Sequence, residues 1–196
     1  MYGYFKRLVD FILAFLILCA IWPLYLIIAL LIRIESPGPV IFKQWRVGQG
    51  HRLFRLYKFR TMDVDSEKDA KYLSEEDDLF CQVHDDPRIT RIGRFLRKLS
   101  FDELPQFFNI LRGDMSLIGP RPLILSESNR LPPVALHRLD IRPGLTGFAQ
   151  AEGRSNASPV DRFAHDLYYV RHYHFLLDVK IALMTLRILV LRKDVI

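Results

Sequence analysis

The most strongly apolar part of the chain lies near its N-terminus. Residues 11–32 form a run of 22 positions without a charged side chain, which exceeds the roughly 18–20 residues that a membrane helix needs. Pro23 stands in the middle of this run and removes one main-chain hydrogen bond, so we expect a kink there. The pattern predicts a membrane-associated helix over residues 1–35 and a second domain over residues 36–196.

Basic residues flank the apolar run on both sides. Lys6 and Arg7 precede it, and Arg33, Lys43 and Arg46 follow it. A helix that spans a bilayer usually has one clearly more basic side. Basic residues at both ends favour a re-entrant helix that enters the membrane and returns to the same face. A kinked helix that crosses the bilayer is the alternative.

Two short segments after the membrane helix alternate between apolar and polar positions. Residues 40–47 and 52–59 are separated by Gly48-Gln49-Gly50, which predicts a β-hairpin. Cations are interspersed along this ribbon, among them Lys58 and Arg60. They indicate either a solvated edge or a ribbon that lies against phosphate, in which case Lys58 and Arg60 are candidates for substrate binding.

Apolar residues recur at three- and four-residue spacing further along the chain, which is typical of amphipathic helices. The pattern predicts one helix over residues 88–99 and a second over residues 104–111, ended by Gly113. Residues 175–191 are mostly apolar but contain charged side chains, so they fit a core helix or an interfacial helix better than a span. The elements predict an α+β fold that is mainly helical.

Charge is distributed unevenly along the chain. Ten of its 22 acidic residues, but only two of its 28 basic residues, lie between Asp63 and Asp86. We interpret this stretch as a helix and a loop on a solvated face. The rest of the chain is strongly cationic, which favours anionic partners such as phosphates, acidic lipid headgroups or nucleic acid. Two distant cysteines exclude a disulfide scaffold and a cysteine-based zinc site.

The strongest local candidate for chemistry is the pair Asp102-Glu103. One interpretation is purely structural: Ser100 and Glu103 have the spacing of a capping box, or Asp102 caps a helix in which Pro105 falls in the tolerated first turn. The functional interpretation is that two carboxylates beside a run of arginines bind a phosphate substrate with Mg²⁺. A carboxylate can also attack phosphorus, and Arg97 could counter the developing charge.

A second candidate is the rigid loop Gly119-Pro120-Arg121-Pro122. Prolines on both sides of Arg121 reduce the entropy lost on fixing it, and a guanidinium binds phosphate with two hydrogen bonds. An exposed turn with an incidental arginine is the alternative. The chain has no phosphate-binding P-loop and no G-x-G-x-x-G motif, so those routes to nucleotide binding are excluded.

Taken in order, these motifs resemble the bacterial monotopic phosphoglycosyl transferases, also called the bacterial sugar transferase family. The resemblance covers nearly the whole chain, and the joint order of its motifs is far more specific than any one of them. Beyond the apolar N-terminal segment, the matching motifs are Ser36-Pro37-Gly38-Pro39, Tyr57-Lys58-Phe59-Arg60-Thr61-Met62, residues 97–106, Gly113-Asp114-Met115-Ser116, residues 119–122 and Arg142-Pro143-Gly144-Leu145-Thr146-Gly147.

The resemblance implies transfer of a sugar-1-phosphate from a UDP-sugar to polyprenyl phosphate, which yields UMP and a polyprenyl diphosphate sugar in an early step of surface glycan assembly. It implies Asp102 as the nucleophile that forms a phosphosugar-aspartyl intermediate, Glu103 as its acidic partner, and Mg²⁺ held by both. Arg97 and Arg121 match arginines near the phosphates.

The resemblance also bears on location. It implies a re-entrant helix, contact with membrane phospholipid, and a catalytic domain over residues 36–196 at the cytoplasmic face of the bacterial inner membrane. It implies no nucleic acid partner. The length suggests the small, catalytic-unit form of the family. One departure is Trp22 before Pro23, where some members have serine.

Two rival hypotheses remain at this stage. The same residues could transfer the sugar phosphate in one direct displacement, without a covalent intermediate. Alternatively, the chain could be a membrane-anchored cationic binding module without catalysis, which would bind liposomes or DNA in a salt-sensitive way. The sequence leaves the transferred sugar and the oligomeric state open.

Overall fold

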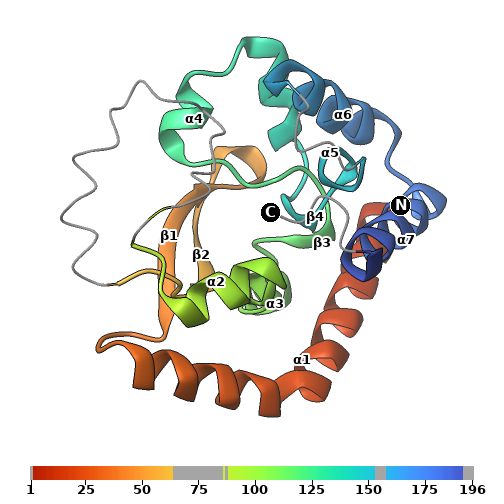
Figure 1. The fold of residues 1–196 in the computed structure, drawn as a ribbon. Coiled ribbons are helices and arrows are strands. Elements are labelled where there is room, and N and C mark those ends of the chain that lie inside the picture. The colour runs from red at the N-terminus through yellow and green to blue at the C-terminus, as the bar shows by residue number, and fades with distance from the viewer. Residues whose placement is uncertain (1, 64–85, 87, 153–157, 192–196) are drawn as a thin grey trace.

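A computed structural model of the chain describes residues 2–63, 86, 88–152 and 158–191 (Figure 1). The fold is mainly helical, with one antiparallel pair of strands and one short parallel pair, which confirms the predicted α+β class. The helix and loop predicted within residues 63–86 lie almost wholly outside the described residues. In chain order the elements are α1 (Tyr2–Glu35), β1 (Ile41–Val47), η1 (Gln49–His51), β2 (Leu53–Phe59), α2 (Arg91–Lys98), η3 (Phe101–Glu103), α3 (Gln106–Arg112), β3 (Ser116–Ile118), α4 (Leu125–Asn129), η4 (Pro133–Leu139), β4 (Gly144–Thr146), α5 (Phe148–Ala151), α6 (Pro159–His172) and α7 (Phe175–Leu191).

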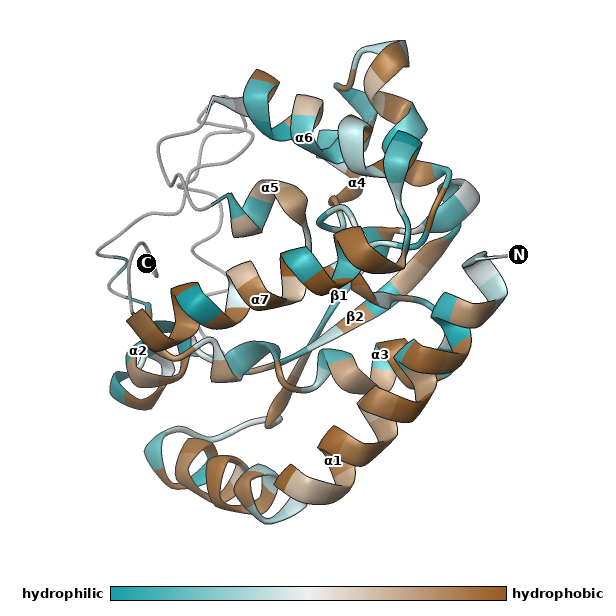
Figure 2. Cartoon of the chain, turned by 90° about the vertical axis from the view of Figure 1, so that its right-hand side faces the viewer, coloured by the Kyte–Doolittle hydropathy of each residue, from teal (hydrophilic) through white to brown (hydrophobic). Residues whose placement is uncertain are grey.

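Helix α1 is long and apolar enough to cross a membrane, and most of its apolar side chains are exposed. It continues through Pro23 as one element but changes direction sharply part way along (Figure 1). The expected kink is therefore a bend within one continuous helix, because a proline removes one hydrogen bond while its neighbours persist. Figure 2 shows hydrophobic residues along nearly the whole of α1.

Both ends of α1 are held by the same globular part of the chain. Near the N-terminal end, Lys6 Nζ lies 2.6 Å from Asp178 Oδ2 of α7. At the other end, the Glu35 carboxylate accepts a 2.7 Å hydrogen bond from the main-chain N–H of Arg91, at the start of α2. A straight helix of 34 residues would be about 51 Å long. The bend thus lets both ends reach one body.

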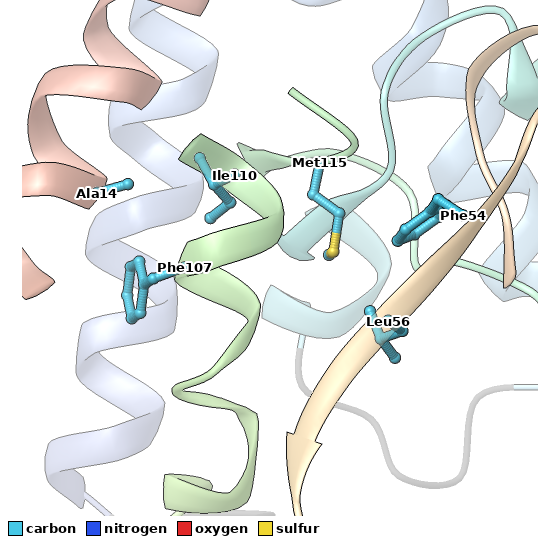
Figure 3. Close-up of a cluster of buried hydrophobic side chains, with 6 residues drawn as sticks. All are labelled: Ala14, Phe54, Leu56, Phe107, Ile110 and Met115. Atoms are coloured by element: carbon cyan, nitrogen blue, oxygen red, sulfur yellow. The ribbon is translucent and has the colours of Figure 1, made fainter. Parts of the chain in front are cut away.

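The predicted hairpin is confirmed. Strands β1 and β2 pair in antiparallel register from Ile41 opposite Phe59 to Val47 opposite Leu53. The buried side chains of β2 meet α1 and α3 in the main hydrophobic core, drawn in Figure 3. That core is formed by Ala14, Phe54, Leu56, Phe107, Ile110 and Met115.

Helix α2 begins later than its predicted start at residue 88. Thr90 caps it by accepting a 2.9 Å hydrogen bond from the Gly93 N–H, which satisfies one of the free donors of the first turn. Gly93 weakens the helix locally but allows close packing, since a Cβ there would lie 2.1 Å from the Thr61 carbonyl oxygen. The glycine therefore lets α2 lie directly against the main chain beyond β2.

The C-terminal part packs around Tyr169 of α6 and Ile181 of α7. Strands β3 and β4 pair in parallel, with Ser116 opposite Gly144 and Ile118 opposite Thr146. Helix α7 buries Leu177, Asp178 and Ile181 and exposes most of its other apolar residues. One face of α7 therefore joins the core, as the core-helix alternative predicts, and its other face is an unpartnered apolar surface within the described residues.

Candidate active site

The acidic pair lies in the tight connection between α2 and α3. Ser100 adopts a left-handed backbone conformation with φ of 56°, which turns the chain sharply after α2, and Asp102 and Glu103 follow in η3. The Ser100 side chain makes no capping bond, and the N-cap position of α3 is Pro105, which makes no side-chain cap. Both capping predictions are therefore wrong. A left-handed non-glycine residue carries strain, and here it presents two adjacent carboxylates.

Lys58 of β2 holds the acidic pair. Its Nζ atom lies 2.7 Å from Glu103 Oε1 and 3.7 Å from Asp102 Oδ2. Asp102 is buried, with 8 % of its surface exposed. The structure thus places one cation and two carboxylates within a single cluster, drawn from residues 45 positions apart in the chain.

The surroundings shift the pKa values of the two carboxyl groups in opposite directions. Burial and the charge of Glu103 raise the pKa of Asp102, against the opposing charges of Lys58 and Arg97. Burial also disfavours ionised Glu103, but the charges of Lys58 and Arg121 and hydrogen bonds from Lys58 and Gln106 hold its pKa below the ordinary value. Glu103 is the more strongly stabilised anion, and Asp102 is the less tightly paired one.

A small pocket opens beside Lys58 and Glu103, and Arg121 lines it from the loop after β3. Arg97 of α2 donates a 2.9 Å hydrogen bond from Nε to Thr61 Oγ1, and its charge acts on Asp102. The structure therefore brings Lys58, Arg97 and Arg121 toward the acidic pair, as the sequence predicts. The pocket is lined by Arg46, Leu56, Lys58, Glu103, Gln106, Arg121, Pro122, Gly144, Leu145 and Gln150.

Arg60 is directed to a different part of the molecule. It is buried, and its two terminal nitrogens donate to the carbonyls of Ser36 and Pro37 at 2.7 and 2.5 Å. These contacts fix the loop between α1 and β1. The structure thus gives Arg60 a structural contact where the sequence predicts contact with substrate.

Two residues near the site were not predicted from the sequence to contribute to it. In the sequence Arg46 is one of several cations of the predicted hairpin, and nothing sets it apart from the others. In the structure it lines the pocket. Asn109 lies fully buried on α3, where it accepts a 3.0 Å hydrogen bond from the N–H of Tyr57 and donates a 2.7 Å bond to the carbonyl of Arg55. The apolar stripe of the predicted helix is formed by Leu104, Phe107, Phe108 and Leu111, so its spacing gave no signal for Asn109. Asn109 fixes the strand that carries Lys58.

The donor set of the site is suited to magnesium. Within the described residues, no group of three or more acidic, histidine or cysteine side chains gathers at one point. Mg²⁺ is commonly held by one or two carboxylates, with substrate phosphate oxygens completing its shell. The adjacent carboxylates of Asp102 and Glu103 fit that kind of ion better than a metal that requires a complete protein cage.

A second, apolar hollow of about 810 Å³ lies between α1, the hairpin and α3. Tyr25 forms part of its wall and donates a hydrogen bond to the carbonyl of Leu104, two residues after Asp102. Pro105, Phe59 and Phe108 also line it, and Lys43 and Arg112 add two cations. The chain thus presents a polar pocket and an apolar groove on either side of the segment that carries the acidic pair.

The chain is similar in sequence to several bacterial proteins. The chain is 42% identical over 192 residues to the UDP-N-acetylgalactosamine-undecaprenyl-phosphate N-acetylgalactosaminephosphotransferase of Aeromonas hydrophila, covering 95% of this chain and 44% of that protein. It is 41% identical over 192 residues to the galactosyl transferase CpsE of Streptococcus agalactiae, covering 95% of this chain and 42% of the relative. The chain thus spans less than half the length of these two relatives.

A third relative is similar in length to this chain. The uncharacterized sugar transferase EpsL of Bacillus subtilis is 39% identical over 182 residues, which cover 93% of this chain and 85% of EpsL. The family described as bacterial sugar transferase matches residues 1–192. The match includes α1, the hairpin and the acidic pair with its surrounding cations. This chain therefore belongs to the bacterial sugar transferase family.

Proposed function

We propose that this protein transfers a sugar-1-phosphate from a UDP-sugar to polyprenyl phosphate. The observation that carries the proposal is the Asp102-Glu103 pair, held by Lys58 beside Arg121 and Arg97, close to a long apolar helix. The names of relatives support the substrates, since one is an N-acetylgalactosaminephosphotransferase and others are glucose-1-phosphate transferases named for UDP-glucose and undecaprenyl phosphate. A cationic binding module would not require this paired-carboxylate cluster.

In the first proposed step, a carboxylate oxygen of Asp102 attacks the phosphorus that bears the sugar. The bond from that phosphorus to the oxygen bridging the two phosphates breaks, and its electron pair leaves with UMP. The sugar phosphate is then bound to Asp102 as an acyl phosphate. Arg121 and Arg97 would stabilise the negative charge that develops on the phosphate oxygens.

In the second step, a phosphate oxygen of the lipid acceptor attacks the same phosphorus. The acyl-phosphate bond breaks, its electron pair returns to Asp102, and the polyprenyl diphosphate sugar is released. Neither step consumes a proton or an oxidant. Because the two substrates need not be bound together, one carboxylate can serve a water-soluble donor and a membrane-bound acceptor in turn.

We propose that Mg²⁺ participates with Asp102 and Glu103. When bound, the ion would neutralise part of the charge on the donor's phosphates. The chain's own groups would do the rest: Lys58 would orient the Glu103 carboxylate, and Arg121, which lines the same pocket, would hold a phosphate oxygen. Glu103 contributes a carboxylate that is ionised, because its cationic neighbours keep its pKa low.

We propose that α1 is re-entrant and that the site faces the cytoplasm at the bacterial inner membrane. Support comes from the attachment of both ends of α1 to one body, together with the exposed apolar side chains between them. Basic residues at both ends of the helix fit a single cytoplasmic side. The apolar groove beside Leu104 and Pro105 supports access for a lipid chain.

The central test is a search for the covalent intermediate. The purified protein is incubated with UDP-sugars and Mg²⁺ in the absence of lipid acceptor, and its intact mass is measured. We expect the mass of one sugar phosphate to be added, with release of UMP, and to be lost when undecaprenyl phosphate is added. Transfer without any adduct would support the one-step displacement. No UMP release with any donor, even when acceptor is present, would contradict the proposed function.

A further inference from the structure

Side-chain hydrogen bonds hold the main chain at Arg121 and at the residue that follows it. A terminal guanidinium nitrogen of Arg138, on η4, donates a 3.0 Å hydrogen bond to the carbonyl oxygen of Arg121 itself. A terminal nitrogen of Arg46, on β1, donates a 3.2 Å bond to the carbonyl of Pro122. Two side chains from distant segments thus fix two successive carbonyls of the loop that carries the proposed phosphate-binding arginine.

Each holding arginine is itself restrained by an acidic side chain. Arg138 forms an ion pair of 2.5 Å with Asp166 of α6, and the two side chains are only 4 and 5 % exposed. Arg46 lies 3.9 Å from Glu127 of α4 and donates a 2.6 Å hydrogen bond to Gln44. The loop is therefore connected to α6, α4 and the hairpin by charged groups.

Stability alone gives a weak reason for this arrangement. Removing a guanidinium and a carboxylate from water is costly, and a buried ion pair is often matched or exceeded in stability by apolar residues of similar volume. The Nε atoms of both Arg46 and Arg138 are also buried without a hydrogen-bond partner among the described residues. What the charged groups add is direction, because a guanidinium can hold a carbonyl and a carboxylate at once.

We propose that Arg138 and Asp166 are positioning residues that orient the Arg121 loop toward the acidic pair, with Arg46 holding the adjoining carbonyl. The inference rests on the proposed function, in which Arg121 binds a phosphate of the donor. Prolines stiffen the loop but do not set the rotation of its peptide groups relative to the pocket. The bond from Arg138 supplies that restraint.

The acidic partners also explain how three arginines can lie together. Burial lowers the pKa of Arg46 and of Arg138, and the nearby charge of Arg121 lowers both further. Asp166 and Glu127 balance the two holding arginines. Arg121 stabilises ionised Glu103 and lines the pocket, where its guanidinium would also bind a phosphate. A misplacement of about 1 Å in such a group can cost about 10²-fold in rate.

The decisive variant replaces both members of the buried pair with apolar residues. Arg138→Met combined with Asp166→Leu removes both charges, so the fold is expected to persist, but the bond to the Arg121 carbonyl is lost. Thermal unfolding establishes that the variant is folded. We expect kcat/KM for the UDP-sugar to fall at least about tenfold, mainly through a higher KM. A folded double variant with wild-type kcat/KM would overturn the proposal.

A mutant cycle tests whether the pair acts through Arg121. If it does, adding Arg138→Met and Asp166→Leu to an Arg121→Ala protein should cause little further loss, because the group they position is already gone. Additive losses would show a separate effect and overturn the proposal. His137→Ala is the matched control: His137 precedes Arg138 on η4, its side chain is exposed and it pairs with Asp140. We expect that control to keep wild-type activity.

Two further outcomes are distinguishable. If the apolar double variant does not fold, Arg138→Lys keeps a cation for Asp166 but lacks the guanidinium that donates to the Arg121 carbonyl. A folded Arg138→Lys protein with unchanged kcat/KM would equally contradict the positioning role. If wild-type protein releases no UMP from any UDP-sugar with undecaprenyl phosphate present, the proposed function has failed. The mutant cycle is run only after a UDP-sugar from which the wild-type protein releases UMP has been found, so that failure of the proposed function and failure of the positioning role are separate results.

Discussion

Lys58 and Glu103 form a close ion pair, 2.7 Å between Nζ and Oε1, while the neighbouring Asp102 carboxylate stands 3.7 Å from the same nitrogen. The lysine therefore binds Glu103 first and leaves Asp102 the freer of two adjacent carboxylates. This asymmetry supports the proposed division of roles, in which Glu103 is anchored by a cation and Asp102 is the nucleophile.

We expect Asp102→Asn to abolish transfer and to form no sugar-phosphate adduct, because an amide is a poor nucleophile toward phosphorus. The loss of UMP release should be at least about 10³-fold, while thermal unfolding stays close to that of the wild-type protein. Asp140→Asn is a suitable control, since Asp140 is an exposed aspartate paired with His137. An active Asp102→Asn enzyme would exclude the covalent mechanism.

Removal of divalent metal should stop UMP release. We expect EDTA to eliminate the activity and Mg²⁺ to restore it, because two carboxylates and a diphosphate offer the oxygen ligands that Mg²⁺ prefers. Glu103→Gln removes one charged oxygen ligand and should raise the Mg²⁺ concentration needed for half-maximal activity. Activity that persists through extensive chelation would rule out the proposed metal requirement.

The re-entrant arrangement predicts that both ends of α1 are reached from one side of a membrane. In a protein with Cys19 and Cys81 replaced by serine, single cysteines are introduced at Tyr4 or Ile34, whose side chains are 89 and 73 % exposed. A membrane-impermeant maleimide should label both in inside-out vesicles and neither in intact spheroplasts. Labelling of the two positions from opposite sides would support a spanning helix.

Asn109 should contribute strongly to stability through the strand that carries Lys58. Asn109→Ala would leave the Tyr57 N–H and the Arg55 carbonyl of β2 without their partner. Leaving buried polar groups unsatisfied costs about 1–3 kcal/mol each, so a loss of about 2–4 kcal/mol in the free energy of unfolding is expected. Asn129→Ala, at an exposed position of α4, serves as the control. Equal denaturation midpoints for the two variants would contradict this role.

The Asp166 carboxyl should give stability a specific pH dependence. Burial raises its pKa to about 6, against the opposing charge of Arg138. An ordinary aspartate titrates near ~3.9, so between about pH 4 and 6 the folded state binds more protons than the unfolded state. The contribution of this group to the free energy of unfolding therefore falls as pH rises through that window.

The comparison with a non-titrating side chain isolates this effect. We expect the wild-type protein to lose thermal stability relative to Asp166→Asn from pH 4 to 6, and the difference to stay constant from pH 7 to 8. Melting temperatures of both proteins across this range provide the measurement. A relative gain by the wild-type protein would mean that the charge of Arg138 outweighs burial at this site.

Features that depend on neighbouring residues could be predicted from the sequence. The uncharged run gave the long N-terminal helix, because membrane helices are defined by length and apolarity. Alternation with a glycine turn gave the hairpin, and residues 175–191 coincide with α7. The order of motifs identified the family and the acidic pair, since that information lies in residue identity rather than in three-dimensional contacts.

Contacts between distant segments were decided only by the tertiary structure. The left-handed turn at Ser100 removed the predicted caps, the Arg60 guanidinium was taken by two carbonyls of the loop after α1, and Asp166 met Arg138 across 28 positions. A sequence pattern reports which backbone conformation and which degree of burial each segment favours. Which donor meets which acceptor depends on how the segments pack, and that is a property of the folded chain.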